Sequence, residues 1–103
     1  MIDRSMIKAS KHKLTKFCKK HHIRKLSFFG SILGKHFSAK SDIDILVEFD
    51  PRNKPGFFNF MRLEEELSAI FHGHKVDLRT PMDLSRYFRD EVLKTAEVIY
   101  IET

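Results

Sequence analysis

Apolar and polar residues alternate strictly between residues 42 and 49. One set would point to one side of a strand: Ile43, Ile45, Val47 and Phe49. The other set would point to the opposite side: Asp42, Asp44, Leu46 and Glu48. A period of two over this length is typical of a strand with one face in the core, and it predicts a central strand over residues 42–49.

Residues 57–71 carry the clearest helical pattern of the chain. Apolar residues recur there at helical spacing: Phe60, Leu63, Leu67, Ile70 and Phe71. Arg62 and residues 64–66 are charged and are expected to face solvent. The pair His72-Gly73 should end the helix, because glycine commonly follows a helix C-terminus. The aromatic residues near 57–60 could stack on bases, but their helical spacing favours a place in the core.

The first forty residues contain weaker signals. A helix is expected over residues 5–22, with Leu14, Phe17 and Cys18 on one face. Residues 24–29 should form a strand that ends at Gly30. Ser31 is expected to cap a short helical turn whose two apolar residues, Ile32 and Leu33, pack inward. Residues 35–41 lack a period and predict a loop.

The pattern of the C-terminal third predicts three elements. They are a strand over residues 74–79, then a helix, then a strand over residues 98–101. Residues 80–83 could begin the helix, with either Thr80 or Asp83 as its cap. One stripe would mark the buried face of this helix: Leu84, Phe88, Val92 and Ala96. Tyr87 and Leu93 lie beside that stripe. The element order predicts an α/β (α+β) fold, with a sheet packed on helices in one domain over residues 1–103.

Composition narrows the class of protein. Hydrophobic residues make up 42% of the 103 residues and include ten phenylalanines, which indicates a folded globule. No apolar run approaches the roughly 20 residues that a membrane span needs. No N-terminal segment resembles a signal peptide. The single cysteine, Cys18, fits a buried structural residue in the reducing cytoplasm, where we expect the protein to act.

The formal net charge is +5, and residues 8–25 are heavily basic. This segment could bind nucleic acid, nucleotide phosphates or an acidic partner, although a solvated helix face is the more common explanation. No known nucleic-acid-binding motif overlaps it, so direct binding of nucleic acid is not expected. The six histidines show no metal-ligand spacing, and those at 21–22, 72 and 74 are expected at the surface.

Asp42 and Asp44 would lie on one face of the central strand, roughly 6.5–7 Å apart at Cα. Two carboxylates in this position repel each other unless a cation sits between them, and divalent ions with oxygen ligands fill that role. Asp77, on another predicted strand, would complete a triad if the two strands are neighbours. Upstream, Gly30 allows close approach of a phosphate, and Ser31 adds a hydroxyl beside free backbone amides. These features together are typical of nucleotide chemistry.

The segment from Gly30-Ser31 to Asp42-Ile43-Asp44 resembles the signature of nucleotidyltransferases of the DNA polymerase beta superfamily. It is most similar to the minimal nucleotidyltransferase (MNT) antitoxins that accompany HEPN-domain toxins. The similarity covers residue 26 to the C-terminus, including residues 76–81 and 87–100. The segment between Gly34-Lys35 and Ala39-Lys40 departs from the family pattern, which often has an arginine after Gly-Ser and Pro-Asp before Ser-Asp.

The resemblance implies an antitoxin that transfers AMP from ATP to a tyrosine of a partner HEPN-domain RNase toxin by two-metal chemistry. Asp42, Asp44 and Asp77 would be catalytic and would bind Mg²⁺ or Mn²⁺. Gly30 and Ser31 would bind the nucleotide. Larger relatives present the acceptor on a second domain, for which this chain has no room, so a partner is expected to supply the acceptor surface.

Two other functions remain open at this point. A non-catalytic antitoxin could mask its toxin by binding alone, but such a protein has no need to keep three repelling carboxylates together. A small-molecule nucleotidyltransferase is also possible, although those enzymes generally have a second domain. We expect no membrane partner.

Overall fold

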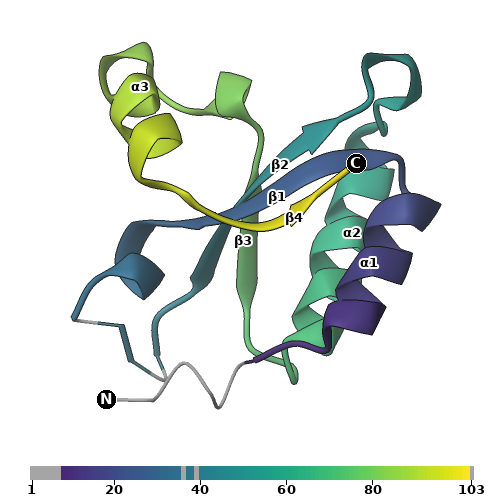
Figure 1. The fold of residues 1–103 in the computed structure, drawn as a ribbon, viewed down its shortest axis with the longest axis horizontal. Coiled ribbons are helices and arrows are strands. Elements are labelled where there is room, and N and C mark those ends of the chain that lie inside the picture. Colours follow the sequence, from purple (N-terminus) through teal and green to yellow (C-terminus); the bar gives the residue numbers. More distant parts are fainter. Residues whose placement is uncertain (1–7, 36, 39, 103) are drawn as a thin grey trace.

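A computed structural model describes residues 8–35, 37–38 and 40–102 and contains a four-stranded mixed sheet (Figure 1). The strands are β1 (Ile23–Phe29), β2 (Ile43–Phe49), β3 (Val76–Arg79) and β4 (Glu97–Ile101). Their order across the sheet is β3-β2-β1-β4. β1 pairs antiparallel with both β2 and β4, whereas β3 runs parallel to β2.

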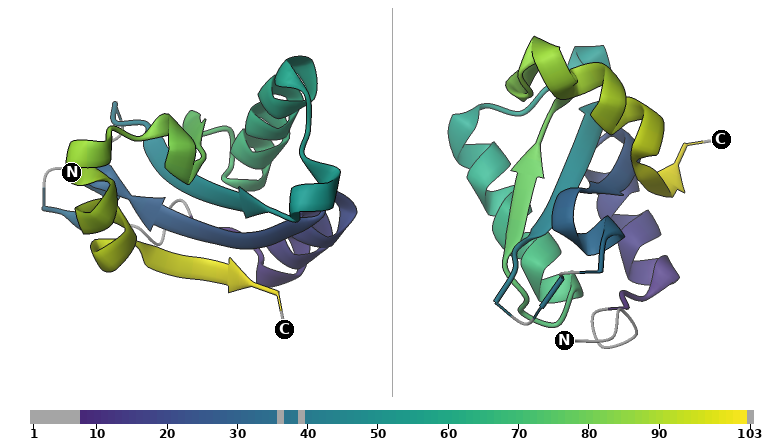
Figure 2. Two further views of the ribbon diagram at one scale, coloured as in Figure 1. Left: turned by 90° about the horizontal axis from the view of Figure 1, so that it is seen from above. Right: turned by 90° about the vertical axis from the view of Figure 1, so that its left-hand side faces the viewer.

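Three α-helices and three 3₁₀ turns connect the strands. The α-helices are α1 (Lys11–Lys20), α2 (Phe57–Ile70) and α3 (Arg86–Thr95). The 3₁₀ turns are η2 (Gly30–Leu33), η3 (Pro51–Asn53) and η4 (Pro81–Asp83). α1 and α2 lie together on one side of the sheet, and α3 lies on the opposite side (Figure 1). The right-hand view of Figure 2 shows η2 and α3 in front of the strands.

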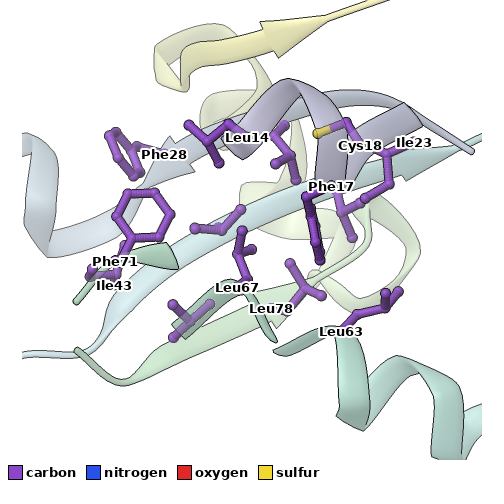
Figure 3. Close-up of a cluster of buried hydrophobic side chains, with 14 of the residues drawn as sticks. Leu14, Phe17, Cys18, Ile23, Phe28, Ile43, Leu63, Leu67, Phe71 and Leu78 are labelled. Carbon is purple, nitrogen blue, oxygen red and sulfur yellow. The ribbon is translucent and has the colours of Figure 1, made fainter. Parts of the chain in front are cut away.

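The sheet face under α1 and α2 is the hydrophobic core (Figure 3). Alternate residues of β2 point into it, as the sequence pattern predicts, and α1 contributes Leu14, Phe17 and Cys18. Cys18 is fully buried, and that burial raises the pKa of its thiol to about 12. α2 adds Leu63 and Leu67, and its last turn leads to Phe71 against Phe28.

The opposite face of the sheet carries the polar residues of β2. Asp44 and Leu46 point to it, and so do their β1 partners Phe29 and Ser27. Leu46 and Ser27 are buried, and η4 contacts β2. The middle of this face is therefore covered, while the end that carries Asp44 remains accessible. We call this surface the site face.

The sequence predicts β1, β2, α2, β3 and β4 to within one or two residues, but the ends of other elements differ. α1 begins at Lys11, because the hydroxyl of Ser10 caps it by accepting the N–H of Lys13. The prediction that this helix begins near residue 5 was wrong for residues 8–10, and residues 5–7 lie outside the described chain. Within that chain, no helix is long and apolar enough to span a bilayer.

The segment after Arg79 forms two helices rather than one. Thr80 and Asp83 form a capping box around η4, so both predicted caps contribute. The helical turn then stops at Leu84, and Ser85 caps α3 separately by accepting the N–H of Tyr87. A single helix from residue 80 was therefore a wrong prediction, because two successive cap residues divide the segment.

Several side chains lie where the pattern did not place them. No residue of α3 itself is buried, so the buried face that its apolar stripe predicts is confirmed only in part. Leu84, just before the helix, is buried and Val92 and Ala96 are half-buried, whereas Phe88 is 48% exposed. Leu33 and Phe58 are exposed rather than packed inward. Glu64, expected in solvent, accepts the N–H of Leu78 at 2.8 Å, because the outer edge of β3 would otherwise lack a partner there.

Candidate functional site

The parallel pairing of β2 with β3 sets Asp44 directly beside Asp77. Neighbouring strands lie about 4.8 Å apart, and paired residues share a face of the sheet. The two carboxylates therefore lie together on the site face, where like charges side by side are destabilising. The condition that the sequence analysis set for Asp77 to join the other two aspartates, that its strand neighbours the central one, is met.

Gly30, which follows β1, lies directly against the carboxylate of Asp44. Its φ of +76° is in the left-handed region, which residues with a Cβ rarely adopt. A Cβ on Gly30 would overlap the carboxylate of Asp44. The following N–H, that of Ser31, hydrogen-bonds to Asp44. Glycine at this position is thus required by both the turn and the close approach.

Ser31 lies inside the turn rather than at its cap. η2 begins one residue earlier than predicted, with Phe29 at the N-cap and no side-chain cap bond. The predicted capping role of Ser31 is therefore wrong, because the left-handed Gly30 starts the turn. The hydroxyl of Ser31 is exposed on the site face, beside the N–H that holds Asp44.

Asp42 directly precedes β2 and is held by a contact that the sequence did not predict. His74 donates its Nε2–H to the backbone carbonyl of Ser41 at 2.7 Å. The His74 ring also packs on Phe37, with 5.6 Å between ring centroids. His74 is half-buried, so its predicted surface location was wrong. No sequence spacing signals this role, since it depends on the fold of the loop over residues 37–41.

Two cations already neutralise the outer carboxylates. Lys75 Nζ lies 3.8 Å from Asp42 Oδ2, and Arg79 Nε lies 3.2 Å from Asp77 Oδ1. Lys75 and Arg79 flank Asp77 along β3, as the sequence predicts. The contacts are partly exposed to solvent and contribute little stability, so other cations can replace them.

Asp44 has no such direct cation. Burial raises the pKa of its carboxyl above the usual value, and the negative charges of Asp77 and Asp42 raise it further. The N–H of Ser31 and the charge of Arg79 oppose that increase but do not cancel it. The site thus holds a negative charge that its own neighbours do not compensate.

The donor set suits a divalent cation, because carboxylate oxygens are the ligands that Mg²⁺ and Mn²⁺ prefer. Within residues 8–35, 37–38 and 40–102, no group of three or more His, Cys, Asp or Glu is arranged to hold a metal ion. Asp42 and Asp77 are turned to Lys75 and Arg79. Binding would therefore require both carboxylates to exchange those partners for the ion, and the metal set remains a prediction.

Two grooves of the molecule lie away from the aspartates of the site. A groove of about 650 Å³ lies between α1 and β4, where Lys11, Lys19 and Tyr100 contribute to its lining. A second, of about 580 Å³, lies between the end of α1 and the start of α2. The side chains of Asp42 and Asp77 are 40% and 35% exposed, so solvent reaches this part of the site face.

Replacing Gly30 with alanine should destabilise the protein by at least about 1–2 kcal/mol, because the left-handed backbone and the overlap with Asp44 both oppose a Cβ. Gly34→Ala is the matched control. Gly34 has a φ of −106°, and a Cβ there meets its nearest atom at 3.6 Å. Urea unfolding at neutral pH measures both variants. Equal stability of the two variants would contradict the tight fit at Gly30.

The raised pKa of Asp44 predicts a pH dependence of stability. The folded protein holds this proton more tightly than the unfolded chain, so stability falls as pH rises from about 3.8 through the raised pKa. Asp44→Asn should remove that loss. We expect the variant to be more stable than wild type at pH 7 and equal to it below the unfolded pKa, by thermal unfolding in EDTA. A variant less stable at pH 7 would refute this explanation.

Curated relatives support a nucleotide-transfer chemistry. The chain is 35% identical over 82 residues to a Methanocaldococcus jannaschii protein assigned as a protein adenylyltransferase, covering 80% of each chain. It is 35% identical over 79 residues to protein adenylyltransferase MntA of Thermococcus cleftensis, covering 77% of this chain and 75% of that protein.

Solved structures share the fold. A structure assigned as a minimal nucleotidyltransferase superposes with a TM-score of 0.68 at 25% identity, covering 88% of each chain. A toxin–antitoxin crystal structure with AMP-PNP also gives 0.68, at 20% identity, covering 91% of this chain and 75% of that one. A complex of tri-AMPylated Shewanella oneidensis HEPN toxin with MNT antitoxin gives 0.62 at 18% identity, covering 89% and 70%.

The family model described as polymerase beta, nucleotidyltransferase matches residues 12–103. This range includes Gly30, Ser31 and all three aspartates of the site. The resemblance seen in the sequence is thereby confirmed, and the mixed sheet with its helices is the fold of minimal nucleotidyltransferases. The chain belongs to the polymerase beta nucleotidyltransferase family.

Proposed function

We propose that this protein is an antitoxin that transfers AMP from ATP to a tyrosine of a HEPN-domain toxin in the cytoplasm. Support comes from relatives that are protein adenylyltransferases and from structural likeness to antitoxins bound to HEPN toxins. The likeness to a complex with AMP-PNP supports ATP as the nucleotide.

One observation carries the proposal. Asp44 on β2 and Asp77 on β3 are paired across two parallel strands. The turn at Gly30, which follows β1, packs closely against Asp44. This arrangement concentrates negative charge on an open face, with a hydroxyl and a glycine backbone beside it. A phosphate-bearing substrate and its cation require those groups together.

In this proposal Asp42, Asp44 and Asp77 hold the divalent cation, Mg²⁺ or Mn²⁺. When bound, such an ion polarises the attacking oxygen and neutralises charge on the leaving pyrophosphate. The turn at Gly30 and the hydroxyl of Ser31 bind the terminal phosphates of ATP. Lys75 and Arg79, released from their carboxylates, are free to face the phosphates.

The transfer forms one bond and breaks one. The tyrosine oxygen bonds to the α-phosphorus of ATP, and the bond from that phosphorus to pyrophosphate breaks. The tyrosine proton passes to a nearby carboxylate, for which Asp77 on the exposed side of the pair is the candidate. The chain accelerates this step mainly by positioning the reactants and by supplying charge, which usually contribute most to the rate in such sites.

The modification would inactivate the toxin by steric and electrostatic exclusion of RNA. An AMP group beside an RNase site adds bulk and a negative charge. Both oppose the approach of RNA, whose backbone is itself negatively charged. A single transfer can therefore neutralise a toxin for longer than the antitoxin remains bound.

A masking antitoxin is the alternative of a different class. Such a protein would gain nothing from a half-buried Asp44 beside two other aspartates, since their repulsion lowers stability. A small-molecule nucleotidyltransferase would use the same carboxylates. The relatives that modify proteins favour a protein acceptor over a small molecule.

Replacing Asp42 and Asp44 together with asparagine should abolish AMP transfer and toxin rescue, because the cation would lose two ligands. The measurement is co-expression with a HEPN-domain toxin, followed by intact-mass analysis of that toxin. Wild type should restore growth and add one adenylyl group or several to the toxin. Excess EDTA should stop the purified reaction.

Glu48→Gln is the matched control for that experiment. Glu48 is on the same face of β2 as Asp44, but it pairs with Lys25 of β1 at the far end of the strand. This variant should rescue growth and modify the toxin as wild type does. If the double variant instead rescues growth with an unmodified toxin, the antitoxin acts by masking and not by catalysis.

A further inference from the structure

The helix α3 has an apolar surface that its own chain does not use. Of the nine large hydrophobic side chains that are exposed in the described residues, six lie between residues 82 and 101. They are Met82, Tyr87, Phe88, Leu93, Val98 and Ile101. Tyr87 is 87% exposed, and Phe88 and Leu93 are 48% and 44% exposed.

A comparison with α1 shows that this exposure is unusual within the molecule. Both helices have ten residues and an amphipathic pattern. α1 buries Leu14, Phe17 and Cys18, whereas α3 buries none of its residues. The same kind of pattern thus places α1 on the core, whereas α3 is covered only in part and keeps large apolar side chains exposed.

Polar contacts hold α3 in place. Arg89 donates Nε–H to the carbonyl of Pro81 at 2.8 Å and Nη2–H to that of Leu84 at 2.9 Å. The hydroxyl of Ser85 caps the first turn. The position of the helix is therefore fixed from its N-terminal end, while its apolar side chains remain available.

Strand β4 continues the surface along the site face, with Val98 nearer to Asp44 and Ile101 at the far end beside Lys25. Val98 pairs with Ser27 and Ile101 with Lys25, both on the face of β1 opposite the core. Val98 and Ile101 are 46% and 57% exposed. They therefore lie on the same face of the sheet as Asp44. Tyr87, Phe88, Leu93, Val98 and Ile101 are called the α3–β4 surface below.

We propose that the α3–β4 surface is where the acceptor toxin docks, so that its acceptor side chain faces Asp44 and Asp77. This inference rests on the proposed function. The acceptor must approach over the site face, and the α3–β4 surface borders that face (Figure 2). Aromatic and large apolar residues are also the groups that anchor protein interfaces.

The position of the surface favours a toxin over a second copy of this chain. A second copy docked through the same surface would bring two site faces together and close both to an acceptor. A toxin on that surface would instead place its own side chain above the carboxylates.

The test compares Tyr87→Ser plus Leu93→Ser with Met61→Ser. Met61 is 49% exposed on α2, on the other side of the sheet, so it matches Leu93 in size and exposure. Steady-state AMP transfer to a purified HEPN-domain toxin gives the KM for the toxin. Affinity for that protein is also measured by calorimetry on an Asp42→Asn, Asp44→Asn background.

We expect the double variant to raise the toxin KM and Kd at least tenfold, with the KM for ATP and kcat within about twofold of wild type. Met61→Ser should change neither. Equal toxin affinity of the double variant and wild type, or equal losses in both variants, would overturn the inference. A wild-type dimer that the double variant dissociates, seen by sedimentation, would assign the surface to self-association instead.

The two proposals can fail separately. If wild type binds the toxin but transfers no AMP, the proposed function is wrong, and the binding data alone decide whether the α3–β4 surface is the docking site. If wild type transfers AMP and the variants bind equally, only the docking inference is wrong.

Discussion

The parallel ladder between β2 and β3 is the constraint on which the site depends. It sets Asp44 beside Asp77 in register, and a slip of one residue would turn one of the two carboxylates into the core. The alternate residues Ile43, Ile45, Val76 and Leu78 are nearly fully buried, so the hydrophobic face fixes that register. The free energy of core burial thereby holds two charges together that would separate in solution.

The electrostatics of the site follow from this arrangement. Lys75 and Arg79 neutralise the two outer aspartates, whereas Asp44 is covered by the Gly30 turn and keeps a raised pKa. The side chains of Lys75 and Arg79 at the edge of the site can therefore be displaced by a divalent cation that also neutralises the carboxylate of Asp44 at its centre. His74 contributes from a distance, since its bond to the Ser41 carbonyl fixes the backbone that carries Asp42.

The sequence was sufficient for the elements whose period is set by the core. The alternation in β2 and the helical spacing in α2 predict the core-facing sides correctly, because burial on that side determines those patterns. The alternation also placed Asp42 and Asp44 on one face, but the register of Asp77 across the strands is contained in no local pattern. The resemblance to nucleotidyltransferases added the roles expected of the three aspartates. Predictions failed where competing local bonds decide, as at Ser85, which starts α3 anew, and at Gly30, which starts its turn before Ser31.

The apolar stripe of α3 was confirmed only in part, for another reason. Its spacing predicts a buried face but does not show how much of that face its own chain covers: Leu84 is buried, Val92 and Ala96 are half-buried and Phe88 is exposed. The sequence also did not predict the hydrogen bonds of Glu64 with Leu78 and of His74 with Ser41, because each joins residues that are distant in sequence. Side-chain bonds to distant backbone groups therefore mark the limit of interpretation from a single sequence.

The central claim is that Asp42, Asp44 and Asp77 form one cation site on the open face of the sheet. Anomalous diffraction from crystals grown with Mn²⁺ and a non-hydrolysable ATP analogue tests it most directly. The account predicts a manganese peak between these carboxylates, with Lys75 and Arg79 turned away from Asp42 and Asp77. A bound nucleotide with no peak there, and with Arg79 still on Asp77, would contradict it.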